Sequence, residues 1–309
     1  MSTTVTHTKT VLLFLLTAAL FFFGACHSYK NNENTFRIAT VDNNVCKKLI
    51  GKVVLYTIFV DTKGTQAWTS YDIQSTLDSI GIATEWIENR AFENNIPLNI
   101  DVQYHQNKKV IPIANNFPNK TLYGTLFSPV ASVGIGKLDR WADRIAKTAG
   151  LTLPVDSATI VKTKNNLSDR ERLIARLRDI NQTDNVVLMY FVNNYYTDEI
   201  SVTLHSASSA NIEYSIVSFK NPAVIAHEFL HIFGALDLYI SPFDTKRSAK
   251  RKKATAMKLY PNEVMAFAYR NIDSLNVSPF TQYLIGWKNE LDEPSRALFF
   301  GKKMKALKY

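Results

Sequence analysis

The stretch "NPAVIAHEFLHIFGALDLY", residues 221–239, has the marks of a short helix followed by a sharp turn. Pro222 suits the first turn of a helix, because the N–H group that proline lacks would have no helical partner there. Gly234 suits the helix end, where glycine adopts the left-handed backbone conformation easily. Helical residues four apart share a face, so His227 and His231 are expected to point the same way. The stretch therefore predicts a histidine-bearing helix around which the remaining elements must be arranged.

The chain before this helix predicts a layered arrangement of strands and helices. The stretch "KVVLYTIFVD" (52–61) and the stretch "NVVLMYFVNN" (185–194) are almost wholly apolar, as is typical of buried central strands. Residues 200–206 alternate between polar and apolar, which predicts an edge strand with one exposed face. The other predicted elements are helices from Thr69 onward, at 137–150 and at 168–180, strands at 98–105 and 212–219, and irregular structure at 106–135. This order predicts an α+β fold, with helices packed on a mixed β-sheet.

The histidine-bearing helix carries the residue types of a metal site. His227 and His231 could present two imidazole nitrogens to one tetrahedral zinc ion. Glu228 follows the first histidine, where its carboxylate could take a proton from a water held by the metal. The turn at Gly234 would let Asp237 supply a third ligand and leave the fourth position to water. A chance match to H-E-x-x-H has a probability on the order of half a percent in such a chain. The alternative is a buried helix whose histidines are satisfied by hydrogen bonds.

The motif H-E-x-x-H-x-x-G-x-x-D at residues 227–237 resembles the zinc-binding signature of the metzincin clan of metallopeptidases, in the variant where aspartate replaces the third histidine. The families with this variant that it resembles most are the snapalysin-like and immune-inhibitor-A-like peptidases of bacteria. The resemblance implies a zincin fold for residues 49–309, with a twisted mixed sheet and two long helices, one of them the active-site helix. It also implies an upper lobe at about 49–234, a smaller C-terminal lobe at about 235–309, and one Zn²⁺ per chain.

Metzincins also carry a methionine turn beneath the metal, and this chain offers Met265 downstream of the motif. An ordinary core methionine is the alternative interpretation of that residue. Several metzincins place a tyrosine two residues after the methionine, near the developing oxyanion, but Phe267 stands there in this chain. The tyrosines that could take over the role are Tyr239, Tyr260 and Tyr269.

A rival for the third metal ligand is Glu263 in "PNEVM" (261–265). Its setting is similar to the N-E-x-x pattern of the thermolysin-like gluzincins. The short spacing from His231 to Asp237 and the turn at Gly234 favour Asp237, and Glu263 remains the alternative.

Together these residues predict a zinc-dependent endopeptidase that hydrolyses peptide bonds with Glu228 as the general base. The edge strand at 200–206 could bind an extended peptide by main-chain pairing. His205 is expected on the exposed face of that strand, where it would either touch substrate or be an ordinary surface histidine. Two alternatives are a zinc hydrolase that acts on a non-peptide amide, and an inactive or non-peptidase surface lipoprotein that binds glycan or protein. The intact Glu228 speaks against an inactive enzyme.

The first residues predict export. A start with a single lysine, an uncharged apolar run and small residues before Cys26 are typical of a signal peptide at 1–25. Gly-Ala-Cys at 24–26 resembles the lipobox of bacterial lipoproteins, which implies acylation of Cys26 and a lipid anchor at the outer membrane or cell surface. Phe23 departs from the leucine preferred there, so a plain signal peptide and secretion is the alternative. Polar residues 26–48 are expected to form a tether. With Cys26 acylated, Cys46 has no partner for a disulfide, and without acylation a bridge between Cys26 and Cys46 is the alternative.

The charge of the chain predicts affinity for anions. The net charge is +9, and "TKRSAKRKKATAMK" (245–258) holds seven Lys or Arg and no acid. This stretch, most basic at 246–253, predicts a solvated loop that could grip acidic substrates or anionic polymers, or be cut in processing. Nucleic acid is not an expected partner, because no aromatic residues are interleaved with the charges. The expected partners are a protein or peptide substrate and, through the anchor, a membrane, with the chain a monomer.

Overall fold

The computed structural model describes residues 48–106, 110–127, 131–153, 168–193, 200–205, 212–218, 220–241 and 244–300. The chain divides into two compact units, 1–36 and 37–309, and every described residue belongs to the second. The predicted signal peptide, Cys26, Cys46 and nearly all of the tether lie outside the described residues. No helix in the described part of the chain is long and apolar enough to cross a membrane.

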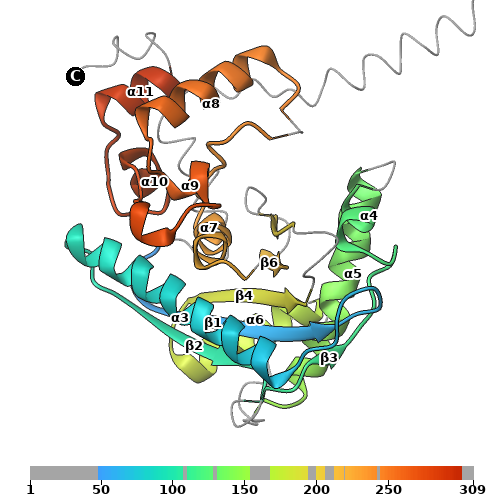
Figure 1. Cartoon of the computed structure of the whole chain (residues 1–309). Helices are drawn as coiled ribbons and strands as arrows, with labels where there is room; N and C mark the ends of the chain where they lie inside the picture. Colours follow the sequence, from blue (N-terminus) through green and yellow to red (C-terminus); the bar gives the residue numbers. More distant parts are fainter. Residues whose placement is uncertain are drawn as a thin grey trace, which may run out of the picture. The chain divides into compact units, whose positions relative to one another are not determined.

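A mixed six-stranded sheet forms the centre of the second unit (Figure 1). Its strands run in the spatial order β2-β1-β4-β6-β5, with the short β3 also paired to β1. All pairs are parallel except β5 with β6, which is antiparallel. β1 and β4 are buried along nearly their whole length, as their apolar sequences predicted. The strands are β1 (Gly51–Asp61), β2 (Leu98–Tyr104), β3 (Ile113–Ala114), β4 (Asn185–Val192), β5 (Val202–Leu204) and β6 (Tyr214–Val217).

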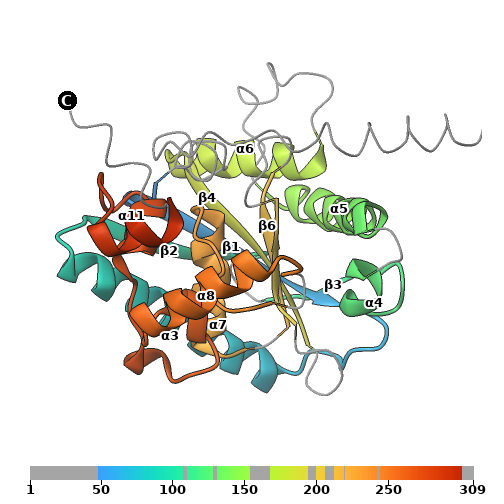
Figure 2. The same cartoon turned by 90° about the horizontal axis from the view of Figure 1, so that it is seen from above.

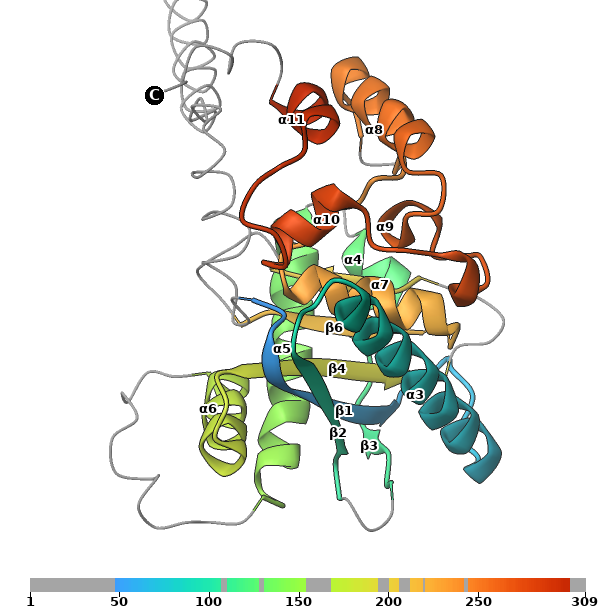
Figure 3. The same cartoon turned by 90° about the vertical axis from the view of Figure 1, so that its left-hand side faces the viewer.

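Helices cover both faces of the sheet. α5 (Ala131–Gly150) and α6 (Asp169–Asn181) lie on one side of the strands, and α3 (Ser70–Glu93) and α7 (Pro222–Ile232) lie on the other (Figures 2 and 3). Alternate β1 side chains such as Val54 and Tyr56 join the α5–α6 core. Successive strand residues point to opposite faces, so the residues between them face α3 and α7. This confirms the predicted α+β class and mixed sheet.

The named elements that follow α7 in the described part of the chain are helices. Its helices are α8 (Arg247–Leu259), α9 (Val264–Phe267), the 3₁₀ turn η3 (Ile272–Ser274), α10 (Pro279–Leu284) and α11 (Glu293–Phe299). They gather on the side of α7 that faces away from the strands (Figures 1 and 3). The start of the sheet is fastened to them, because Leu49 N–H donates to Ile285 O at 3.0 Å and Trp287 Nε1 donates to Leu49 O at 2.7 Å.

Two predictions about helices were wrong in their extent. The basic stretch 245–258 was predicted as a loop, but most of it forms α8. Ala, Lys, Arg and Met all favour a helix, and Ala256 of this helix is buried. Irregular structure was predicted up to residue 135, but α5 already begins at Ala131. Gly134, near the start of α5, permits close packing, because a Cβ there would collide with the carbonyl oxygen of Thr125 in α4 (Leu122–Leu126).

Candidate metal centre

Local sequence sets the bounds of the candidate active-site helix α7. The side chain of Asn221 caps it by accepting from the Ala223 N–H at 2.8 Å, and Pro222 occupies the first turn. The helix ends at Ile232, and Gly234 adopts φ +93°, a backbone conformation that glycine reaches without steric cost. The prediction for this stretch is confirmed, and the turn carries the chain back beneath the helix.

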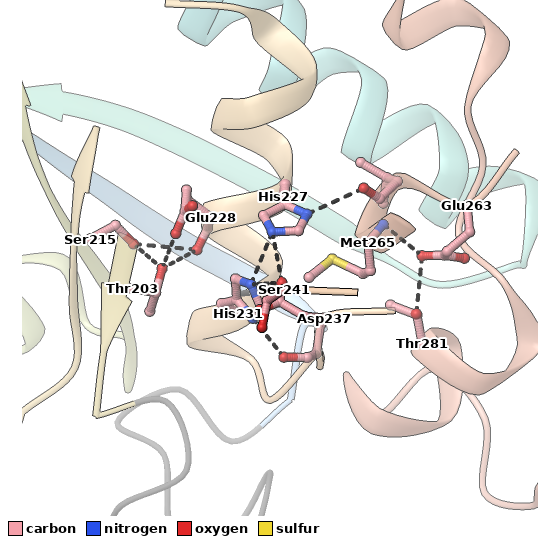
Figure 4. A network of polar contacts seen from close by, with 12 residues as sticks. Thr203, Ser215, His227, Glu228, His231, Asp237, Ser241, Glu263, Met265 and Thr281 are labelled. Atoms are coloured by element: carbon pink, nitrogen blue, oxygen red, sulfur yellow. Dashed lines mark hydrogen bonds and ion pairs between the residues drawn. The ribbon is translucent and has the colours of Figure 1, made fainter. Parts of the chain in front are cut away.

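The turn brings Asp237 to the two histidines (Figure 4). The Nε2 atoms of His227 and His231 lie 3.0 Å apart, and Asp237 Oδ1 lies 3.2 Å and 3.1 Å from them. Two ligands of a tetrahedral zinc ion, each bonded at about 2.0–2.1 Å, stand about 3.3 Å apart. The spacing of these three atoms is therefore compatible with one small metal ion between them.

The other ring nitrogens of the two histidines fix their orientation. His227 Nδ1 lies 3.2 Å from the carbonyl oxygen of Val264, and His231 Nδ1 lies 2.8 Å from that of Ala235. Since a carbonyl oxygen only accepts, both Nδ1 atoms carry protons and both Nε2 lone pairs face the cluster. Two such lone pairs and the carboxylate of Asp237 need a cation among them, either a proton or a metal ion. The donor set thus fits a zinc ion.

Electrostatics in the cluster reflect this need for a cation. Burial alone would lower the pKa of His231, but the charge and hydrogen bond of Asp237 outweigh it and raise the pKa to about 9. Burial would raise the pKa of Asp237, but the charge of His231 and the hydrogen bonds from both histidines hold it well below its usual value. Both shifts have the same cause, the attraction between the carboxylate of Asp237 and positive charge at the imidazole of His231.

Glu228 leaves α7 toward the edge of the sheet, beside the histidine pair (Figure 4). The side chain is buried, with 5% of the residue exposed. Its Oε2 accepts a hydrogen bond from Thr203 Oγ1 in β5 at 2.6 Å. Thr203 Oγ1 in turn lies 2.7 Å from Ser215 Oγ in β6. The sequence did not single out either hydroxyl, because a Thr or Ser in a strand carries no chemical signature of its own.

Glu263 is not part of the cluster. It caps α9 by accepting from the Met265 N–H at 3.1 Å, and it also accepts from Thr281 Oγ1 at 3.1 Å and from the Ser278 N–H. Burial raises the pKa of its carboxyl, although these bonds oppose the shift. Glu263 therefore joins α9 to α10, and the structure brings Asp237, rather than Glu263, to the histidines.

Met265 is fully buried and lies between the histidine pair and Glu263 (Figure 4). Its carbonyl oxygen accepts from the Leu238 N–H at 3.0 Å. This bond fastens the segment that carries Asp237 to α9. Phe267, two residues on, is buried and lies under the guanidinium of Arg270 at 4.0 Å.

The three candidate tyrosines differ in their distance from the cluster. The ring of Tyr239 lies 6.1 Å from the ring of His227, and burial raises the pKa of its hydroxyl. Tyr260 instead bonds Ser295 in α11, and Tyr269 is 70% exposed beside Phe267. Of the three, the structure brings Tyr239 to the histidines.

The prediction of an exposed His205 was wrong. Its side chain is only 12% exposed, and its Nε2 lies 2.8 Å from Asp139 Oδ1 in α5. Arg170 Nη2 and Tyr214 Oη reach the same carboxylate oxygen, each at 3.2 Å. The prediction assumed that side chains alternate between the two faces of the strand as far as residue 206. The strand β5 ends at Leu204, however, and His205 adopts φ +68°, so its side chain does not follow that alternation.

No family model matches the chain, and comparison with curated proteins and with solved structures gave no match either. Three features of the site bear on its chemistry: the convergence of His227, His231 and Asp237, the orienting bonds on both Nδ1 atoms, and the buried carboxylate of Glu228 next to them.

Proposed function

We propose that this protein is a zinc-dependent endopeptidase in which His227, His231 and Asp237 hold one zinc ion and Glu228 is the general base. The observation that carries the proposal is the meeting of both Nε2 atoms with Asp237 Oδ1 at 3.0–3.2 Å. This donor set, two imidazoles and one carboxylate, leaves a coordination position open, as catalytic zinc sites require.

Zinc, when bound, supplies a Lewis acid that polarises the peptide carbonyl and lowers the pKa of water. The protein's own residues do the rest. The carbonyl oxygens of Val264 and Ala235 fix the orientation of the two imidazole rings. The Met265 carbonyl oxygen fixes the segment that carries Asp237, because it accepts a hydrogen bond from the Leu238 N–H. The site is therefore preorganised by backbone bonds rather than by mobile side chains.

Glu228 has the position that a general base needs. It stands next to His227 in the helix, and its buried carboxylate lies on the side of the edge strand. From there it would take the proton of the attacking water and pass it to the leaving amine. Tyr239, the tyrosine near His227, is the group best placed to support the developing oxyanion, because Phe267 has no donor to offer.

The substrate we propose is an extended peptide. β5 ends the strand order of the described sheet, and Thr203 in β5 bonds Glu228, so the sheet edge and the base are adjacent. A peptide that pairs with this edge would pass over the histidine pair in a fixed direction. A mixed sheet with the long α3 on one face also supports a metzincin-like fold, with Met265 as its methionine turn. The active-site helix was expected to be long as well, but α7 has only 11 residues, because the chain turns at Gly234.

Export, a lipid anchor on Cys26 and a monomeric state remain part of the proposal on the strength of the sequence alone. They would place the peptidase at the cell envelope, attached by a tether of about 20 residues. Retention of the protein in the membrane fraction, and its loss from that fraction on Cys26→Ser, would test the anchor.

Elemental analysis of the purified protein tests the metal. We expect about one zinc per chain in the wild type and in Glu228→Gln, and loss of zinc in His231→Ala. Glu228→Gln should also lower the turnover of a fluorogenic peptide library by at least about 100-fold, since it removes the base but no ligand. A folded wild type without zinc would refute the proposal, and a zinc-loaded wild type that cleaves only non-peptide amides would correct its substrate.

A further inference from the structure

We propose that Thr203 is a positioning residue for Glu228. Its hydroxyl holds one oxygen of the catalytic carboxylate on the sheet side, so that the remaining acceptor sites of the carboxylate face the attacking water. The inference rests on the proposed function. It adds a role for β5 beyond binding of the peptide backbone, because the same strand would also set the orientation of the base.

The hydrogen-bond geometry assigns the direction of the contact. Thr203 Oγ1 has one proton and two near acceptors in Glu228, the carboxylate Oε2 at 2.6 Å and the backbone carbonyl at 3.1 Å. The shorter distance and the charge of the carboxylate identify Oε2 as the acceptor. The lone pairs of Thr203 Oγ1 can then accept the proton of Ser215 Oγ, 2.7 Å away.

The sheet register explains why the two hydroxyls meet. Thr203 and Ser215 are direct partners in the antiparallel β5–β6 pair, so their side chains lie on the same face. The neighbour Leu204 points to the opposite face, where it joins the α5–α6 core. Ser215 is fully buried, and its Oγ also lies 3.3 Å from the Glu228 carbonyl oxygen. The hydroxyl pair is thus wedged between the strands and α7.

A carboxylate has two oxygens with about four acceptor sites in all. The bond from Thr203 uses one site of Oε2 and leaves the remaining sites of Glu228 for the attacking water. Without that bond the side chain could rotate about its terminal torsions, whose energy wells are broad. Misplacement of a catalytic group by about 1 Å can cost up to about 100-fold in rate. The effect is therefore expected in kcat rather than in KM.

The experiment compares Thr203→Val, which has nearly the same shape, with Thr203→Ser, which keeps the hydroxyl. Steady-state cleavage of a fluorogenic peptide and zinc content are measured for both. For Thr203→Val we expect a kcat lower by about 10- to 100-fold, a KM within about twofold of wild type and an unchanged zinc content. Thr203→Ser should recover most of kcat. Thr57→Val, which removes a strand hydroxyl bonded to Gln103 O at 3.2 Å, is the matched control and should keep wild-type kcat.

A second variant keeps the inference testable if Thr203→Val folds poorly, and a spectroscopic readout tests it independently of activity. Ser215→Ala removes the donor behind Thr203 and should lower kcat a few-fold with zinc unchanged. The infrared difference spectrum between each protein and its Glu228→Gln derivative isolates the carboxylate band of Glu228, which should shift when the Thr203 hydroxyl is removed. This band does not depend on activity.

The possible failures are distinct. A wild-type kcat in Thr203→Val together with an unshifted Glu228 band would overturn the positioning role while the peptidase proposal stood. Equal losses in Thr203→Val and Thr203→Ser would also overturn it, because the hydroxyl would then not be the cause. Absence of zinc or of peptide cleavage in the wild type would overturn the proposed function itself, and the inference with it.

Discussion

Asp237 Oδ1 lies 3.1 Å from His231 Nε2, although the two residues are separated by a helix end and a reversal of the chain. Gly234 makes this meeting possible with its φ of +93°. The arrangement concentrates two imidazoles and one carboxylate within a stretch of 11 residues, 227–237. Most of the candidate centre therefore depends on local backbone geometry, so single substitutions can test it.

The identity of the third ligand can be tested with two acidic residues. We expect Asp237→Ala to lose zinc, because Asp237 Oδ1 is the carboxylate oxygen at the two Nε2 atoms. Glu263→Gln should retain zinc, since its carboxylate bonds the backbone of Met265 and Ser278. It should still lower the free energy of unfolding by about 1–3 kcal/mol, because the new NH₂ group faces a backbone donor. Zinc content and urea unfolding check both, and the opposite pattern of zinc loss would make Glu263 the ligand.

A methyl group at the turn should be costly. Gly234→Ala places a Cβ on a residue at φ +93°, so we expect a loss of about 1–2 kcal/mol in the free energy of unfolding and weaker zinc binding. Gly81→Ala is the matched control. Gly81 lies within α3, where an added Cβ meets nothing within 4 Å, so this change should stabilise the protein by about 0.5–1 kcal/mol. Chemical denaturation of the two variants in parallel measures their free energies of unfolding. Equal changes in both variants would contradict the role of Gly234 in the turn.

The ion cluster of Asp139 should make stability depend on acid pH. Burial would raise the pKa of Asp139, but the hydrogen bond from His205 and the charge of Arg170 outweigh it and lower the pKa. A lowered folded pKa contributes stability above the ordinary aspartate pKa of about 4, and this stability is lost as pH falls through the folded value. Asp139→Asn should therefore cost about 2 kcal/mol at pH 7 and progressively less below about pH 4.

Urea unfolding at a series of pH values checks this dependence. Glu93→Gln is the control, because Glu93 is 52% exposed in its pair with Arg90 and should contribute little at any pH. A gap between wild type and Asp139→Asn that stayed constant down to pH 2 would contradict the assignment.

Proline substitutions can test whether the basic stretch is a helix in solution. Ala254→Pro lies in the interior of α8 and should cost about 3 kcal/mol through a lost hydrogen bond and a clash with the preceding turn. Ala249→Pro lies in the first turn, where proline is tolerated, and should change stability little. Circular dichroism and thermal melting distinguish the two. A solvated loop at 245–258 would tolerate both equally.

How much could be predicted from the sequence depended on the range of the interaction. The bounds of α7, the helix at 168–180 and the edge position of β5 follow from local patterns, and the structure confirms them. The contacts of His205 with Asp139 and of Thr203 with Glu228 join elements that only the tertiary fold brings together. Neither His205 nor Thr203 stands at a sequence spacing that would predict its partner.

The error over the basic stretch has a different cause. Charge indicates that a segment is solvated, but lysine and arginine favour a helix as much as many apolar residues do. Burial of Ala256 adds to this preference for a helix, and the sequence does not reveal that contact. Glu263 illustrates the same limit, because its role depends on the position of α10.

The two hydrogen bonds that join Leu49 to Ile285 and Trp287, here called the Leu49 clasp, affect the order in which the chain folds. Leu49 stands just before the central strand β1, yet both its backbone groups are bonded by Ile285 and Trp287. A chain that is threaded or synthesised from its N-terminus cannot close this clasp until almost all of it has emerged. The start of β1 would therefore reach its final state late, and a fragment that ended after α7 would lack both bonds to Leu49.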